Sequence, residues 1–143
     1  MDTVQIACPS CLTANRVPSA RLAEDPKCGR CHRPLLEGRP VELREDQLEA
    51  FLSRTRLPVI VDFWAPWCGP CRTMAPHFER AAAELRHEAQ LAKVNIDEAQ
   101  SLAARYGIRA VPTVILFRNG AEAARHAGAV DAGTLLRWAA SAT

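Results

Sequence analysis

The sequence predicts an α/β fold, in which helices flank a central sheet, preceded by a small module that is too short to fold without a cross-link. From residue 41 onward, strand-like and helix-like segments alternate, whereas residues 1–39 are repeatedly interrupted by proline and glycine. In addition, all six cysteines fall into pairs separated by two residues. We therefore expect two parts, residues 1–39 and residues 40–143.

The N-terminal part needs an additional source of stability. It shows no sustained helical or strand periodicity and contains Pro9, Pro18, Pro26, Pro34 and Gly38. A segment this short and this often interrupted cannot bury enough apolar surface to offset the conformational entropy that it loses on ordering. A cross-link is therefore required.

The larger part begins with a strand, a helix and a second strand. Residues 40–43 predict a short strand, and residues 44–55 predict a helix with Leu48 and Phe51 on one face. The β-branched and aromatic run 57–65 is typical of a central strand that is covered on both faces.

A long helix is predicted over residues 71–89, with its first turns distorted by Pro76. A strand, a short helix, a hairpin turning at Asn119-Gly120 and a final helix follow. These elements span residues 91–96, 99–107, 113–128 and 131–142.

Composition and charge exclude several classes of protein. The chain is 48% hydrophobic and 24% charged with a net charge of +2, which is typical of a globular protein and gives no indication of a nucleic-acid partner. Its apolar runs are far shorter than the roughly 18 residues of a membrane helix. The opening "MDTVQIACPSC" lacks the apolar region of a secretory signal. We therefore expect a cytoplasmic protein with no membrane or nucleic-acid partner.

The cysteine pair in "WCGPC" has the setting of a redox site. Pairs of this kind in a reducing cytoplasm are seldom structural disulfides, so metal binding and redox catalysis are the default. Cys68 follows the buried strand at the start of the long helix, where unpaired N–H groups and the helix dipole stabilise a thiolate. Cys71 lies one turn further in, where we expect it to be more buried and placed to attack a mixed disulfide on Cys68. Pro70 suits a first helical turn.

Several segments between residues 41 and 143 share their order and spacing with a known family. They are "VDFWAPWCGPC", "NID", "YGIRAVPT", "LFRNG" and the pair Gly128-Ala129, and they resemble the thioredoxin family. The resemblance implies the thioredoxin fold, with a central mixed sheet flanked by helices. It also implies a thiol-disulfide oxidoreductase that reduces protein disulfides through a redox-active Cys68–Cys71 disulfide and is itself reduced by a thioredoxin reductase using NADPH. No tightly bound organic cofactor is expected, because the chain has no glycine-rich dinucleotide motif.

The resemblance implies roles for two charged residues. Asp62, six residues before Cys68, would be a desolvated carboxylate of raised pKa that takes and returns the proton of Cys71. An acid that reaches water at the end of its strand is the alternative for Asp62. Lys93 matches the family lysine near that acid, and a solvated surface lysine is the alternative.

The resemblance also implies a docking surface for substrates. Val111 and Pro112 match the family's cis-proline loop, which would leave the Val111 backbone free to pair with an extended substrate chain. Trp64 is expected in the core, in a supporting position near the site. The surface is expected to be completed by Trp67, Gly69, Pro70, Ile108, Gly128 and Ala129.

The remaining cysteines have the spacing of a zinc site. Cys8, Cys11, Cys28 and Cys31 form two C-x2-C pairs separated by sixteen residues, which predicts one structural Zn2+ held by four thiolates. Such a site would supply the missing stability. The sequence "CGRCH" also fits c-type haem attachment, but haem would leave the first pair unexplained and needs export. His32 could replace a cysteine on the metal, but four thiols are already present, so we expect it to be incidental.

The segments "CPSCLTANRVP" and "KCGRCHRPL" ahead of the thioredoxin-like part resemble the thioredoxin 2 subclass, whose members carry an N-terminal zinc module. The resemblance then covers the whole chain and implies a bacterial cytoplasmic protein, which we expect to be a monomer. Two alternatives stay open. One is a zinc-linked redox sensor or holdase chaperone that loses its metal on oxidation, and the other is a docking adaptor. No function is expected for His77, His87 or His126.

Overall fold

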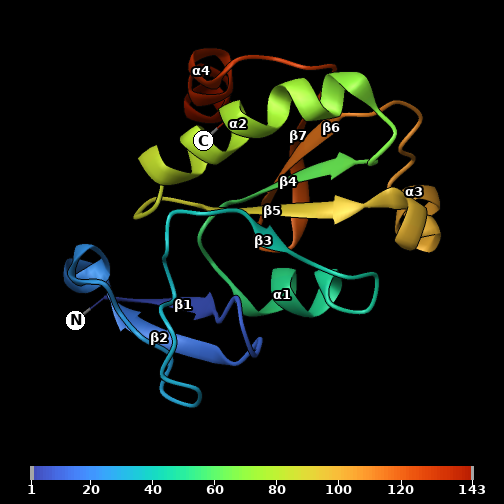
Figure 1. Cartoon of the computed structure of the whole chain (residues 1–143). Helices are drawn as coiled ribbons and strands as arrows, with labels where there is room; N and C mark the ends of the chain where they lie inside the picture. Colours follow the sequence, from blue (N-terminus) through green and yellow to red (C-terminus); the bar gives the residue numbers. More distant parts are fainter. Residues whose placement is uncertain (1, 143) are drawn as a thin grey trace.

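Two sheets of unequal size organise the computed structural model, which describes residues 2–142 (Figure 1). The small sheet pairs β1 (Thr3–Ala7) with β2 (Ala14–Pro18). The large sheet has the strand order β3-β5-β4-β6-β7, in which β3, β5 and β4 are parallel and β6 and β7 run antiparallel to their neighbours. These five strands span Val41–Glu42, Gln90–Asn95, Val59–Trp64, Thr113–Arg118 and Ala121–Ala127. The prediction of a mixed sheet is therefore confirmed.

Helices cover both faces of the large sheet. On one face, α1 (Leu48–Arg54) and α3 (Gln100–Arg105) pack on Val59, Val61 and Phe63 of β4. On the other face, α2 (Gly69–Glu84) and α4 (Ala132–Ala142) pack on Ile60 and its neighbours. This two-sided burial explains the continuous apolar run in β4. No helix within residues 2–142 combines the length and the apolar character needed to cross a membrane.

From residue 40 onward most element bounds agree with the prediction to within two residues, and the larger differences lie at helix ends. Helix α1 begins at Leu48 rather than at residue 44, because the Gln47 side chain accepts a hydrogen bond from the backbone N–H of Arg44 in a preceding turn, 2.9 Å. Helix α2 includes Pro76 and ends at Glu84, five residues early, because the chain turns there to enter β5. The hairpin turns at Asn119 and Gly120, whose φ angles are both positive, as predicted.

The N-terminal module contains a hairpin that we did not predict. The expectation of no strand periodicity in residues 1–39 is wrong, since β1 and β2 pair in register from Thr3–Pro18 to Ala7–Ala14. Ile6 and Val17 are buried in a small cluster with Leu35, Leu36 and Leu57. Only every second residue of each short strand faces this cluster, so the apolar pattern is too brief to stand out in the sequence.

The module is docked at the N-terminal ends of β4 and β5, beside α1 (Figure 1). The Gln90 side chain donates to the carbonyl oxygen of Ala7 at 3.1 Å and accepts from the Thr55 hydroxyl at 2.5 Å. The N–H of Arg56 donates to the carbonyl oxygen of Gln5 at 2.7 Å. Cys68 follows the C-terminal end of β4, so the module lies at the end of the sheet away from Cys68.

Candidate functional site

Cys68 and Cys71 form a disulfide at the N-terminus of α2, with their Cα atoms 5.2 Å apart. Cys68 is the N-cap residue, and its sulfur accepts a hydrogen bond from the N–H of Cys71 at 3.1 Å. A thiolate at this position would receive the same hydrogen bond and the favourable end of the helix dipole. We expected Cys71 to be more buried than Cys68, and the two are 3% and 4% exposed, so the difference has the expected direction but is small.

The loop before β6 lies against this disulfide. The Val111-Pro112 peptide bond is cis, as the resemblance implied. The sulfur of Cys68 lies 3.5 Å from the carbonyl oxygen of Val111. The carbonyl oxygen of Pro112 accepts a hydrogen bond from the N–H of Gly128 at 2.9 Å, so the Gly128 turn joins the same site. Gly128 has a φ of 103°, a conformation that favours glycine.

The exposed rim of the site comes from the turn that precedes α2. Trp67 is 64% exposed, and Gly69 and Pro70 are exposed beside it. Trp64, which we expected in the core, is only half-buried and packs against the cluster of Ala65, Cys68 and Cys71. Ile108 instead packs against the core beneath α1 and α3. These placements leave an open surface around the disulfide.

Asp62 is a buried carboxylate with no hydrogen-bond partner among the described residues. It shares a strand face with Ile60, on the side covered by α2. Burial raises the pKa of Asp62 from 3.8 to about 7, against the smaller opposing effect of Lys93. Lys93 is its register partner on β5, and the Lys93 ammonium lies 4.6 Å from the centre of the Trp64 ring. The alternative in which the Asp62 carboxylate reaches water at the end of its strand is therefore excluded.

We predict that Asp62→Asn stabilises the oxidised protein at alkaline pH. Between about pH 4 and pH 7 folded Asp62 keeps a proton that the unfolded chain has released, so the free energy of unfolding falls as the pH rises through this window. A pKa difference of this size between the folded and unfolded states lowers the free energy of unfolding by about 4 kcal/mol across this window. Urea unfolding should therefore show the variant more stable than wild type by this order at pH 8 and by little at pH 4. A gain that does not depend on pH would contradict the raised pKa.

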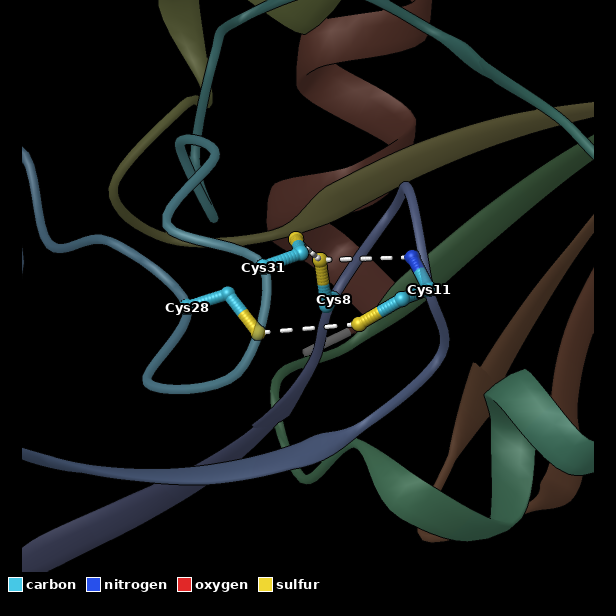
Figure 2. Close-up of side chains that lie close together, drawn as sticks. All are labelled: Cys8, Cys11, Cys28 and Cys31. Carbon is cyan, nitrogen blue, oxygen red and sulfur yellow. Dashed lines mark hydrogen bonds between the residues drawn. The ribbon is translucent and has the colours of Figure 1, made fainter.

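The four other cysteines converge on one point. Figure 2 shows their side chains pointing toward one another from two loops, and their sulfur atoms all lie within 4.8 Å of one another. The Cys8–Cys31 and Cys11–Cys28 sulfur pairs are 3.6 Å apart. Tetrahedral zinc with Zn–S bonds of about 2.3 Å requires sulfur atoms about 3.8 Å apart. The cluster therefore fits a four-thiolate zinc ion.

The two cysteine loops repeat one backbone geometry. In each loop the first cysteine accepts from the residue four positions later and donates to the carbonyl five positions later, in bonds of 2.8 to 2.9 Å. The N–H groups of Ser10 and Arg30 point at the sulfurs of Cys8 and Cys28, at 3.3 and 3.4 Å. Such donors balance the negative charge of metal-bound thiolates.

The thiols of the cluster differ in acidity. The backbone N–H of Cys31 is the main cause that lowers the pKa of Cys28 to about 6. Burial raises the pKa of Cys8 to about 12. A bound metal must displace the proton of Cys8, so metal affinity should weaken as the pH falls.

Comparison with known proteins decides the family. The Thioredoxin model matches residues 39–141, and a second model, described as Thioredoxin 2, N-terminal, matches residues 7–33. The chain belongs to the thioredoxin family. Thioredoxin C-3 of Corynebacterium nephridii is 41% identical over 133 residues, which cover 93% of this chain and 91% of that protein. Thioredoxin M-type, chloroplastic, of Chlamydomonas reinhardtii is 35% identical over 85% of this chain and 89% of its own length.

This thioredoxin-family chain is a thiol-disulfide oxidoreductase, and its N-terminal module is the zinc ribbon of the thioredoxin 2 subclass. All four predicted metal ligands lie in one cluster, which favours a metal over haem at "CGRCH". The structure also brings Cys68, Cys71, Val111 and Gly128 together, whereas these residues are up to 60 positions apart in the sequence.

Two contacts were missed at the sequence level. The indole N–H of Trp67 donates to the Asp97 carboxylate at 3.2 Å, which fixes the orientation of the exposed ring. Asp97 lies within the "NID" segment that marks the thioredoxin family, so that segment contained the information. The second contact is made by His77, whose Nδ1 accepts from the N–H of Ala132 at 3.2 Å and joins α2 to α4.

His32 has a conformational role in the zinc ribbon. Its φ of 65° lies in the left-handed region, as does that of Leu12 at the equivalent position of the first loop. We predict that His32→Val lowers the thermal midpoint of the zinc-loaded protein by the equivalent of about 1 to 2 kcal/mol, because a β-branched residue is disfavoured there. His32→Gly should leave the thermal midpoint nearly unchanged, since glycine relieves the backbone strain at this positive φ but also gives the unfolded chain more conformational entropy. The neighbouring exposed Arg33→Val is the control, and an equal loss there would contradict this role.

Proposed function

We propose that the chain reduces disulfide bonds of other proteins through the dithiol of Cys68 and Cys71. The observation that carries the proposal is the position of Cys68 at the N-cap of α2, beside the Val111 carbonyl and the exposed Trp67. This position stabilises a thiolate and leaves open protein surface next to it. The Cys68–Cys71 disulfide is the state that follows one turnover.

The reaction proceeds in two exchange steps. The Cys68 thiolate attacks one sulfur of the substrate disulfide, forms a mixed disulfide and releases the first substrate thiolate. The Cys71 thiolate then attacks the Cys68 sulfur, releases the second substrate thiolate and closes the Cys68–Cys71 disulfide. The substrate gains two electrons and the dithiol loses two.

We assign Asp62 as the base that removes the Cys71 proton before the second step. A carboxylate with a pKa of about 7 is half ionised near neutral pH and is suited to both accept and return a proton. Burial on the α2 side of the sheet, without a competing hydrogen-bond partner among the described residues, supports this role. Lys93 and Trp64 support it by moderating the charge of Asp62 and by closing one side of the site.

Substrate chains dock on the surface beside Cys68. We propose that the Val111 backbone pairs with an extended segment next to the substrate disulfide, with Pro112 holding the loop and Gly128 leaving room beside it. Trp67, Gly69 and Pro70 supply the exposed contact on the opposite side. The positions of these residues around the disulfide support the proposal.

The zinc ribbon has a structural function. We propose that residues 1–39 form a module that holds one Zn2+ through Cys8, Cys11, Cys28 and Cys31, and that residues 40–143 form the catalytic domain. The sulfur spacing and the backbone donors support zinc. When bound, the metal supplies folding energy and charge neutralisation, with no part in disulfide exchange.

A thioredoxin reductase that uses NADPH is the proposed electron donor, and the bacterial cytoplasm is the proposed compartment, where the protein acts as a monomer. Membership of the thioredoxin family supports the donor, and the four cluster thiols call for a reducing compartment.

The test follows reduction of insulin disulfides with electrons from either dithiothreitol or NADPH plus a bacterial thioredoxin reductase. We expect the chain to accelerate reduction with both donors. No acceleration with dithiothreitol would overturn the reductase function. Acceleration with dithiothreitol alone would overturn only the proposed electron donor.

A further inference from the structure

The side chain of Asn15 connects the two cysteine loops of the zinc ribbon. Asn15 lies on β2, just after the first loop, and is half-buried. Its Oδ1 accepts a hydrogen bond from the N–H of Gly29 in the second loop at 2.9 Å. Its Nδ2 donates to the carbonyl oxygen of Thr13 in the first loop at 3.0 Å and lies 3.5 Å from the sulfur of Cys28.

These contacts use both ends of the amide. The acceptor end holds the turn between Cys28 and Cys31, and the donor end is anchored on the first loop and directed at a metal ligand. The two loops are separated along the chain by β2 and by the 3-10 helix η1 (Ser19–Glu24), so their relative position depends on contacts of this kind. Mutation of residues that orient metal ligands without binding the metal themselves commonly lowers metal affinity by about 10- to 100-fold.

We propose that Asn15 is a positioning residue of the zinc ribbon, which keeps the second cysteine loop at metal-binding distance from the first and thereby slows loss of the metal. The inference rests on the proposed zinc site and adds a residue that is not itself a ligand. Asn15 donates a hydrogen bond toward the Cys28 sulfur from the side of the first loop, and the N–H of Arg30 donates to the same sulfur from within the second loop. Charge on that sulfur is therefore balanced from both loops.

The chemistry of the amide distinguishes positioning from space filling. Asn15→Asp keeps the shape and the acceptor for Gly29. It replaces the donor with an oxygen that faces the Thr13 carbonyl, and it adds negative charge beside the Cys28 thiolate. Asn15→Leu removes both hydrogen bonds and keeps a similar volume. If Asn15 only filled space, the leucine, which keeps the volume, would be harmless.

The experiment measures zinc loss from the full-length protein. Each zinc-loaded variant is mixed with excess chelator, and release is followed with the dye 4-(2-pyridylazo)resorcinol. We expect release to be about 10- to 100-fold faster in Asn15→Leu than in wild type, and faster still in Asn15→Asp. Arg16→Ala is the matched control, because Arg16 is the next residue on β2 and is exposed. It should release zinc at the wild-type rate.

A second readout reports the thiolates directly. Wild type loaded with Co2+ should show the charge-transfer absorption of four thiolates around tetrahedral cobalt, and Asn15→Asp should shift it, whereas Arg16→Ala should leave it unchanged. Disulfide reductase turnover and far-ultraviolet circular dichroism should be unchanged in all variants that fold. If Asn15→Leu does not fold, Asn15→Ser, which keeps a short polar group that cannot span both partners, replaces it.

The outcomes separate the two proposals. Absence of tight zinc in wild type would overturn the metal site itself. Tight zinc in wild type, with release from Asn15→Leu no faster than from Arg16→Ala, would overturn only the role of Asn15. Wild-type release from Asn15→Asp would do the same, because it would show that the donor end is not needed.

Discussion

Cys68→Ser is expected to lower disulfide reductase turnover by at least about 1,000-fold while leaving the zinc content unchanged. Serine keeps the shape of the N-cap side chain, but a hydroxyl is not ionised at neutral pH and cannot form the mixed disulfide. Because Cys68 lies at the end of the sheet away from the zinc ribbon, the four metal ligands should be unaffected. Insulin reduction and zinc analysis on one preparation measure both effects.

Cys71→Ser is the matched control for this result. It keeps the attacking thiol and removes the thiol that releases the substrate, so the first step should occur and the second should not. A mixed disulfide between Cys68 and the substrate should therefore accumulate and be detected by intact mass spectrometry. Normal turnover in Cys68→Ser, or no trapped species in Cys71→Ser, would overturn the proposed order of attack.

The double substitution Cys8→Ser and Cys11→Ser is expected to abolish tight zinc binding and to unfold the N-terminal module. Structural zinc contributes on the order of 10 kcal/mol to the folding of small domains. The apolar cluster around Ile6 and Val17 is too small to replace that contribution. Hydrogen exchange should show loss of protection in β1 and β2, while turnover through Cys68 persists.

Unfolding of the N-terminal module should also lower the stability of the rest of the chain. Ala7 belongs to the main apolar cluster, and its carbonyl oxygen accepts from Gln90. Unfolding of β1 therefore uncovers apolar surface and leaves the buried Gln90 amide, which also accepts from Thr55, without its Ala7 partner. We expect a lower thermal midpoint for the domain in the double variant. The control is Cys68→Ser, which should keep both zinc and the midpoint. Retained tight zinc after loss of Cys8 and Cys11 would overturn the four-thiolate site.

Local sequence patterns were sufficient to predict those features that depend on the residues of one short segment. The apolar run of β4 followed directly by "WCGPC" predicted a buried strand, a helix N-terminus and a redox pair, and the structure has all three. The spacing of the four other cysteines predicted their convergence, because two short loops with the same backbone turn present their thiols in the same way. The Asn119-Gly120 turn was predicted because both positions need positive φ.

Other features depend on segments that are distant in the sequence. The hairpin of β1 and β2 was missed because its strands are short and their apolar residues face a cluster completed by Leu35 and Leu57. The partner of His77 was missed because Ala132 is 55 residues away. The small difference in burial between Cys68 and Cys71 could not be read from the sequence either, because Val111, 40 or more residues away, packs against the cluster that contains both.

The sequence by itself predicted the two cysteine chemistries, the order of the elements from residue 41 onward and the family, since each depends on spacing or periodicity within short segments. Only the tertiary structure decided how buried Asp62 is, which residue fixes Trp67, how Asn15 links the two cysteine loops and where the zinc ribbon docks. Burial, desolvation and hydrogen bonds between distant segments exist only after the chain has folded. The same spacing of two cysteines therefore contributes to a thiol cluster that fits zinc in the N-terminal module and forms a disulfide at a helix N-terminus in the larger part.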